Sequence, residues 1–135
     1  MMKAVITCLL LPLALGFKFH IPTETMLRWE HLIEPFKLGC IQESGVDYDA
    51  GLNVLLRMQL PDDENGQCYL KCLAERVEIY DGKSHTFIKE RVIEKLGTTE
   101  EMFEECFATF PHTEDCKIVH AAAQCIVSKL AVPIV

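Results

Sequence analysis

The sequence has few basic residues and, after its first sixteen positions, no long hydrophobic run. Its 135 residues include 13 Lys and Arg against 20 Asp and Glu, a formal net charge of −7. A negative chain lacks the positive field that phosphate groups require, so nucleic acid and anionic membrane surfaces are not expected partners. No later segment is apolar for long enough to cross a bilayer, so we expect no membrane insertion. Repeats and linkers rich in Pro, Gly or Ser are also absent, which predicts one domain.

The sequence also lacks the motifs of an enzyme. A small secreted phospholipase would show adjacent cysteines followed by a His-Asp pair and a glycine-rich calcium loop, and the chain has none of these. No local motif suggests a Ser/His/Asp arrangement. Isolated acids such as Glu100 and Glu101 suit the start of a helix better than catalysis. We therefore expect no catalytic residue.

The first sixteen residues are typical of a secretory signal peptide. Lys3 provides the positive charge, the stretch 4–16 is apolar, and Ala14 and Gly16 give the small-x-small pattern that signal peptidase cleaves. The sequence therefore predicts cleavage of residues 1–16 and secretion of residues 17–135 as a single helical domain. The mature chain keeps 12 basic and 20 acidic residues, a formal charge of −8.

The cysteine content points to disulfides. Of seven cysteines, Cys8 leaves with the signal peptide, and six remain: Cys40, Cys68, Cys72, Cys106, Cys116 and Cys125. An even number in a small secreted chain predicts three disulfides, because the compartment is oxidising and a small domain buries little surface.

A metal site or a redox site fits these cysteines poorly. Three residues separate Cys68 from Cys72, whereas a thioredoxin-type site has two. Zinc sites use two clustered pairs of ligands, but the downstream cysteines are nine and ten positions apart and no His-x3-His accompanies them. We therefore expect neither a metal nor a cofactor.

Six cysteines allow fifteen pairings, of which helix geometry removes some. Cys68 and Cys72 are four apart on one helix face, too close for an unstrained bridge. Cys116 and Cys125 are nine apart, which on a helix places them on opposite faces with about 13 Å of rise between them. Each excluded bridge occurs in three pairings and one pairing contains both, so ten pairings remain open.

Apolar residues recur at helical spacing along the whole mature chain, and no stretch alternates with period two for long enough to predict a sheet. Caps and breaks then predict an all-α fold of six helices. Their expected limits are a first helix from Pro22-Thr23 to Gly39, a second from Asp47 to Pro61, a third from Asp62-Asp63 to Asp81-Gly82, a fourth from Phe87 to Gly97, a fifth from the capping box Thr98–Glu101 to Pro111, and a sixth from Thr113 to Leu130.

The spacing of the cysteines carries a family resemblance. The gaps are 27, 3, 33, 9 and 8 residues, and the stretch Cys-Tyr-Leu-Lys-Cys at 68–72 lies on the predicted third helix. Together with the signal peptide and six helices, this resembles the insect odorant-binding proteins, the pheromone and general odorant-binding family. The resemblance covers essentially all of residues 17–135.

The resemblance implies a disulfide pairing and a function. The family's pattern of first to third, second to fifth and fourth to sixth implies Cys40–Cys72, Cys68–Cys116 and Cys106–Cys125, which is one of the ten pairings left open. It also implies a compact fold, cross-linked around an apolar internal cavity, that carries small hydrophobic odorants or pheromones through aqueous fluid without covalent chemistry or a cofactor. A membrane chemoreceptor and a second copy of the chain are the implied macromolecular partners.

The residues expected to line the cavity come from the predicted third to sixth helices and the apolar C-terminal tail. They are Leu70, Leu73, Val77, Val92, Leu96, Phe103, Phe107, Val119, Ala122 and Ile126, with Ile134 and Val135 as a lid. The run 121–123 of three alanines on an apolar helix leaves volume for a ligand or for close helix packing. Relatives are reported to release ligand as the pH falls, and the hypothesis here is that His120, or acidic residues near the tail, loosens the lid on acidification.

Two alternatives to an odorant carrier stay open at this point. The same fold could carry other lipids in reproductive tissue, saliva or venom, or it could bind a protein. The mature sequence does not distinguish these uses, because the tissue of expression is not encoded in it.

Overall fold

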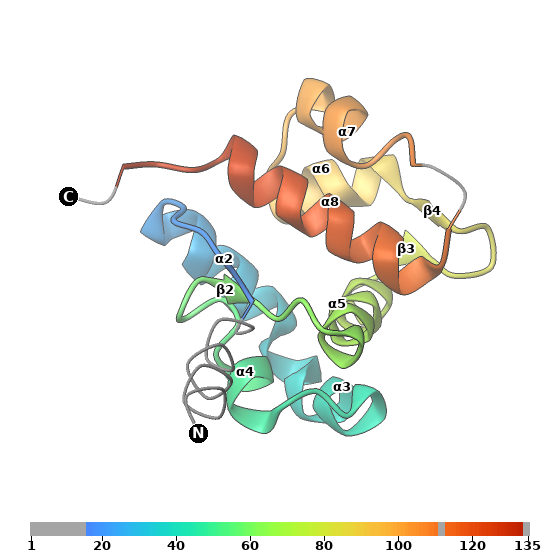
Figure 1. The fold of residues 1–135 in the computed structure, drawn as a ribbon. Coiled ribbons are helices and arrows are strands. Elements are labelled where there is room, and N and C mark those ends of the chain that lie inside the picture. Colours follow the sequence, from blue (N-terminus) through green and yellow to red (C-terminus); the bar gives the residue numbers. More distant parts are fainter. Residues whose placement is uncertain (1–15, 111–112, 134–135) are drawn as a thin grey trace, which may run out of the picture.

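Six helical segments make up most of the part of the chain that this computed structural model describes, residues 16–110 and 113–133 (Figure 1). The all-α class and the six helical segments are confirmed. In chain order the segments are α2 (Thr23–Ile33) continuing through the 3-10 turn η2 (Glu34–Phe36) into α3 (Lys37–Ser44), α4 (Tyr48–Leu52), α5 (Glu64–Arg76), α6 (Lys89–Leu96), α7 (Glu100–Cys106) and α8 (Asp115–Lys129). Of the predicted signal peptide, residues 1–15 lie outside the described residues.

The first helical segment is longer than predicted and is interrupted in the middle. Pro35 lacks a backbone N–H and tightens the helix into η2, after which α3 continues past Gly39 to Ser44. The predicted end at Gly39 is therefore wrong. The segment ends at Gly45, whose φ of 75° is left-handed, a conformation that glycine adopts without steric cost.

The second helix begins as predicted but is short. The Asp47 carboxylate accepts a hydrogen bond from the Ala50 N–H at 3.0 Å, so Asp47 is the N-cap of α4. The helix ends at Leu52 instead of continuing to Pro61, and turns follow as far as Met58. Strand β2 (Gln59–Leu60) then pairs antiparallel with β1 (Phe17–Lys18), which fixes the start of the domain against this loop.

The third helix, α5, ends five residues before the predicted Asp81-Gly82. Glu78 adopts a left-handed φ of 64°, its N–H bonds the Glu75 carbonyl, and the Ile79 N–H bonds the Ala74 carbonyl, both at 3.0 Å. These are the two hydrogen bonds of a Schellman motif. The chain then forms a hairpin in which β3 (Tyr80–Asp81) pairs with β4 (Thr86–Phe87).

The later helices agree with the sequence at some ends and differ at others. The predicted start of the fourth helix at Phe87 is wrong, because Phe87 belongs to β4 and α6 begins at Lys89 with Ile88 as its N-cap. Gly97 closes α6 with a φ of 72°, as predicted. The N-cap of α7, however, is Thr99, whose hydroxyl accepts from the Met102 N–H at 3.1 Å, and the predicted Thr98–Glu101 capping box is wrong. Thr98 is instead buried, 5% exposed. Helix α7 ends at Cys106 and α8 starts at Asp115, so both are shorter than predicted.

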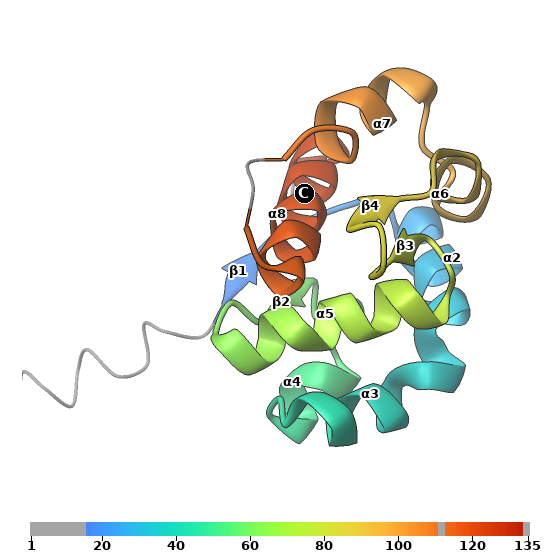
Figure 2. The same ribbon diagram turned by 90° about the vertical axis from the view of Figure 1, so that its right-hand side faces the viewer.

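Helix α5 lies at the centre of the molecule. It packs against α8 on one side and α3 on the other, while α7 packs on α8 and α6 contacts α7 and α2 (Figures 1 and 2). The three disulfides follow these contacts. Cys40–Cys72 joins α3 to α5, Cys68–Cys116 joins α5 to α8, and Cys106–Cys125 joins α7 to α8. These are the three pairs that the family resemblance implied.

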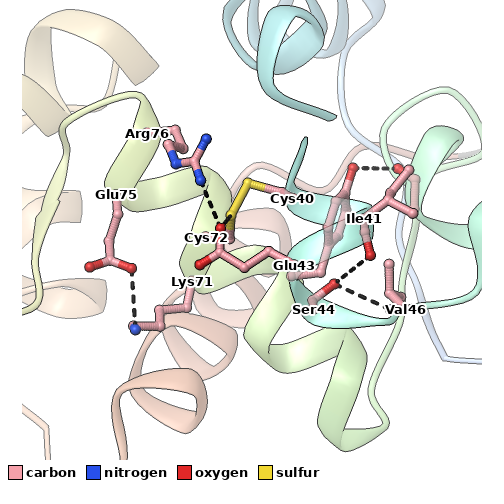
Figure 3. The surroundings of a disulfide bond; sticks show 11 residues. Cys40, Ile41, Glu43, Ser44, Val46, Lys71, Cys72, Glu75 and Arg76 are labelled. Atoms are coloured by element: carbon pink, nitrogen blue, oxygen red, sulfur yellow. Dashed lines mark hydrogen bonds and ion pairs between the residues drawn. A yellow bond between two sulfur atoms is a disulfide. The ribbon is translucent and has the colours of Figure 1, made fainter. Parts of the chain in front are cut away.

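Surface ion pairs flank the first of these bridges. Beside Cys40–Cys72, the Arg76 guanidinium of α5 donates to the Glu43 carboxylate of α3 at 2.7 Å (Figure 3). Both side chains are about half exposed, so this pair contributes little energy. The disulfide and the packing beneath it therefore hold α3 on α5.

Candidate functional site: an apolar cavity

An apolar cavity of about 120 Å³, here called the inner cavity, lies between α2, α5 and α8. The loop after α4, strand β2, the residues directly after α5, strand β4 and the ends of α6 and α7 complete its wall. The lining residues are Trp29, Leu32, Ile33, Val54, Leu55, Leu60, Leu70, Leu73, Ala74, Val77, Ile79, Phe87, Leu96, Phe107, Val119, Ala122, Ala123, Ile126 and Val127.

The wall of the inner cavity consists almost entirely of carbon. Among its nineteen side chains, only Trp29 has a polar atom, and its indole N–H donates to the Leu96 carbonyl at 2.9 Å. The Val77 carbonyl accepts a hydrogen bond from the Lys95 ammonium at 2.7 Å. These polar groups of the wall are thus already bonded to the protein. A ligand in this cavity therefore gains its binding energy from apolar contact.

The structure brings eight of the predicted cavity residues together around the inner cavity. They are Leu70, Leu73, Val77, Leu96, Phe107, Val119, Ala122 and Ile126. Val92 and Phe103 do not line it: Val92 is fully enclosed in the core, and Phe103 faces a different pocket. Ile134 and Val135, the predicted lid, lie outside the described residues.

Sequence reasoning missed the contribution of the first helix. One face of α2 lines the cavity with Trp29, Leu32 and Ile33. These residues stand at positions i, i+3 and i+4, a spacing that could have identified them as cavity residues. Ile79 and Phe87 gave no such signal, because they precede or belong to two-residue strands. Of the alanine run, Ala122 and Ala123 line the cavity, whereas Ala121 is exposed.

A second, larger pocket of about 510 Å³, here called the outer pocket, lies between the β3–β4 hairpin, α7 and the start of α8. Four phenylalanines form its apolar part, and Thr86 and Thr113 contribute hydroxyls. The lining residues are His85, Thr86, Phe87, Lys89, Phe103, Glu104, Phe107, Ala108, Phe110, Thr113 and Ile118.

Charged groups at the rim of the outer pocket are paired with one another. The Lys89 ammonium donates to Glu100 at 2.7 Å and to Glu104 at 3.1 Å, and these bonds raise the pKa of Lys89. The His85 Nδ1 lies 2.7 Å from the Asp115 carboxylate, which also accepts a hydrogen bond from the Tyr80 hydroxyl. Partial burial opposes the ionisation of Asp115, but the two hydrogen bonds outweigh it and lower its pKa.

The segment after α8 is held by His20. The Val132 N–H donates to the His20 carbonyl at 2.8 Å, and the His20 Nδ1 lies 3.2 Å from the Val132 carbonyl oxygen. The predicted switch, His120, is buried on α8 and lines neither pocket. Burial lowers its pKa, against a smaller opposing effect of Asp62.

Within residues 16–110 and 113–133, no three His, Cys, Asp or Glu side chains gather in a way that could bind a metal ion. None of the described helices combines the length and the apolar composition that a membrane span requires.

A family model matches most of the chain. The model of the PBP/GOBP family aligns with residues 23–129, from the start of α2 to the end of α8. The chain therefore belongs to the insect odorant- and pheromone-binding protein family, whose members bind small hydrophobic ligands as carriers and are not enzymes. Neither a search of curated proteins nor a search of solved structures found a match.

Proposed function

We propose that this protein is a secreted carrier that takes up a small apolar molecule, an odorant or a pheromone, in the inner cavity. The observation that carries the proposal is the carbon wall of that cavity, in which the indole N–H of Trp29 is already bonded to Leu96. Each Å² of apolar ligand surface removed from water contributes about 25 cal/mol. In contrast, a ligand hydroxyl left without a partner there would lose roughly 1–3 kcal/mol.

The size of the inner cavity limits what it can hold without rearrangement. An engineered cavity of about 150 Å³ with similar apolar walls binds benzene, and the inner cavity is slightly smaller at about 120 Å³. A larger odorant therefore requires the walls to move or additional space to open.

A displacement titration tests ligand binding. A neutral naphthylamine probe, whose emission rises in apolar surroundings, is bound first and then displaced by alcohols, esters, aldehydes and fatty acids. The Ala122→Leu variant fills the inner cavity and should weaken probe binding at least tenfold. Ala121→Leu adds the same carbons at the adjacent, exposed position and should leave binding unchanged.

Two outcomes would contradict the carrier proposal. If the wild-type protein binds neither the probe nor any of the four ligand classes, a protein-binding role becomes the better explanation. Equal effects of Ala122→Leu and Ala121→Leu would place the probe outside the inner cavity.

Secretion and olfactory use have their own tests. Expression of the full chain in insect cells should release a product that begins at Phe17, which N-terminal sequencing would show. Immunolocalisation in antennae, reproductive tissue and salivary or venom glands would then distinguish an odorant carrier from a carrier of other lipids.

A further inference from the structure

The inner cavity and the outer pocket are separated by two aromatic side chains. Among the described residues, Phe87 and Phe107 line both spaces. Their ring centroids are 5.0 Å apart with an interplanar angle of 77°, an edge-to-face contact, and both rings are buried. The partition between the two spaces therefore includes side chains that can change rotamer without displacing a helix.

The backbone positions of these two rings are well anchored on both sides. Phe87 lies in β4, whose pairing with β3 holds it in register with Tyr80. Phe107 directly follows Cys106, which is bonded to Cys125 of α8. An opening of this partition would therefore require the two rings to rotate against their other aromatic neighbours, Tyr80, Phe103 and Phe110. The two rings lie where a ligand passing from one space to the other would have to separate them.

The inner cavity alone is small for a ligand pocket, and the outer pocket would supply the missing volume. Ligand pockets usually measure about 300–1,000 Å³. The inner cavity, at about 120 Å³, falls below that range, whereas the outer pocket, at about 510 Å³, falls within it. A ligand longer than a single ring can therefore gain the space it needs by extending past the two phenylalanines.

The chemistry of the outer pocket indicates which end of such a ligand it would hold. Glu104 lines the pocket, and the carboxylates of Glu100 and Asp115 pair with the lining residues Lys89 and His85. Lys71 also acts electrostatically on Asp115, so three carboxylates near the rim stand against two ammonium groups and one imidazole. A carboxylate ligand would meet this negative excess, and the cations are already paired. The Thr86 hydroxyl, hydrogen-bonded to the Ser84 hydroxyl at 2.7 Å, keeps a further lone pair, and the Thr113 hydroxyl also lines the pocket. Both suit a neutral group that can form a hydrogen bond with a hydroxyl.

We propose that the protein binds an elongated molecule across both spaces, with its hydrocarbon end in the inner cavity and a neutral polar end, a hydroxyl, aldehyde or ester, in the outer pocket. The chain of the ligand passes between Phe87 and Phe107. This inference rests on the proposed carrier function and specifies the ligand class and its orientation.

Calorimetric titration of the mature protein with benzene and with 1-dodecanol tests the inference. Ala108 lines the outer pocket only, and Ala108→Trp fills that pocket without touching the inner cavity. This variant should weaken 1-dodecanol binding at least tenfold and leave benzene binding within twofold. Thr109→Trp, which adds the same ring at an exposed neighbouring position that lines neither space, is the matched control and should change neither affinity.

Two further comparisons complete the experiment. Ala122→Leu, in the inner cavity, should weaken both ligands. Dodecanoate at pH 7 should bind at least tenfold more weakly than 1-dodecanol, because its charged end would enter the negative rim.

The outcomes separate this inference from the carrier function. If Ala108→Trp leaves 1-dodecanol binding unchanged, the ligand lies wholly in the inner cavity, so the inference is overturned and the carrier function stands. If Ala122→Leu leaves 1-dodecanol unaffected, the ligand lies only in the outer pocket, and the inference is again overturned. Binding of neither ligand by the wild-type protein would overturn both.

Discussion

At the scale of single residues, the most consequential side chain is Lys37, which the core encloses almost completely. It is 4% exposed, its ammonium pairs with Glu30 of α2, and it donates to the Leu52 carbonyl at the end of α4 at 2.7 Å. One oxygen of Glu30 is buried without a hydrogen-bond partner. The pair thus connects α2, α3 and α4, at the cost of two desolvated charges.

Replacing Lys37 alone should destabilise the protein strongly. Lys37→Met leaves the Glu30 carboxylate buried without its cation, which typically lowers the free energy of unfolding by about 3–5 kcal/mol. The double variant Lys37→Met with Glu30→Leu removes both charges and should recover most of that loss. Urea unfolding measures both values, and a double variant no more stable than the single one would contradict the argument.

His120 should make stability depend on pH. Burial lowers its pKa in the folded protein below the value of about 6.5 expected in the unfolded chain, so the unfolded chain takes up the proton first as the pH falls. The contribution of the neutral ring is therefore present above about pH 6.5 and is lost as the pH falls toward the folded-state pKa. His120→Leu should show a shallower decrease of melting temperature between pH 7 and pH 5.

The release of ligand on acidification remains a prediction. If His120 is the switch, the affinity of the naphthylamine probe should fall between pH 7 and pH 5 in the wild type and fall less in His120→Leu. An affinity that is equal at the two pH values in the wild type would end the hypothesis.

At the scale of helices and strands, the start of α7 offers a sharp test, because two adjacent threonines have opposite roles. The Thr99 hydroxyl caps the helix, whereas the Thr98 hydroxyl is buried with no hydrogen-bond partner. Thr99→Val should cost about 1 kcal/mol, within the usual range for a lost N-cap. Thr98→Val has the same shape and should be neutral or stabilising.

Thermal unfolding of the two valine variants decides between these roles. A loss of stability in Thr98→Val rather than in Thr99→Val would restore the capping box that the sequence favoured.

The sequence predicted helix starts better than helix ends, and individual residues explain why. Asp47 identified the start of α4 because its side chain bonds the helix locally. The end of α5 was missed because the left-handed position of its Schellman motif is occupied by Glu78, where glycine would have given a signal. The interruption at Pro35 was not predicted, because a proline in the first turn of a helix is tolerated and gives no clear signal of a break.

The residues that line the cavity could be predicted only in part, because local patterns reveal helix faces but not contacts between distant parts of the chain. Residues such as Leu73 and Ile126 lie on helix faces whose apolar periodicity is visible in the sequence. Leu60 and Phe87 reach the cavity from two-residue strands, and their positions depend on pairing with Phe17 and Tyr80 far along the chain. The positions of Leu60 and Phe87 at the cavity therefore depend on tertiary packing, which local sequence patterns do not encode.

At the scale of the whole molecule, the disulfides connect the helices in one chain of contacts, from α3 through α5 and α8 to α7. Helix α8 carries two of the bridges, one near its start and one near its end. The packing of α8 on α5 and α7 is thus fixed at both ends, while its middle turns face the inner cavity. This arrangement can keep an apolar space open that helix packing alone would tend to close.

The three bridges should differ in their contribution to stability. Removal of a native bridge from a small domain usually costs about 2–5 kcal/mol. Cys68–Cys116 spans 48 residues and Cys106–Cys125 spans 19, so loop-closure entropy predicts that the first contributes roughly 0.8 kcal/mol more. Urea unfolding of the two double Cys→Ala variants measures the difference, and a larger loss from Cys106–Cys125 would contradict the entropic account.

Trp29 is the single tryptophan of the chain, and it is buried in the wall of the inner cavity. Its indole emission therefore originates from one known place, beside whatever molecule occupies that space. A bound ligand should therefore shift the emission maximum and change the intensity of tryptophan fluorescence, so that uptake and release can be followed on the unlabelled protein.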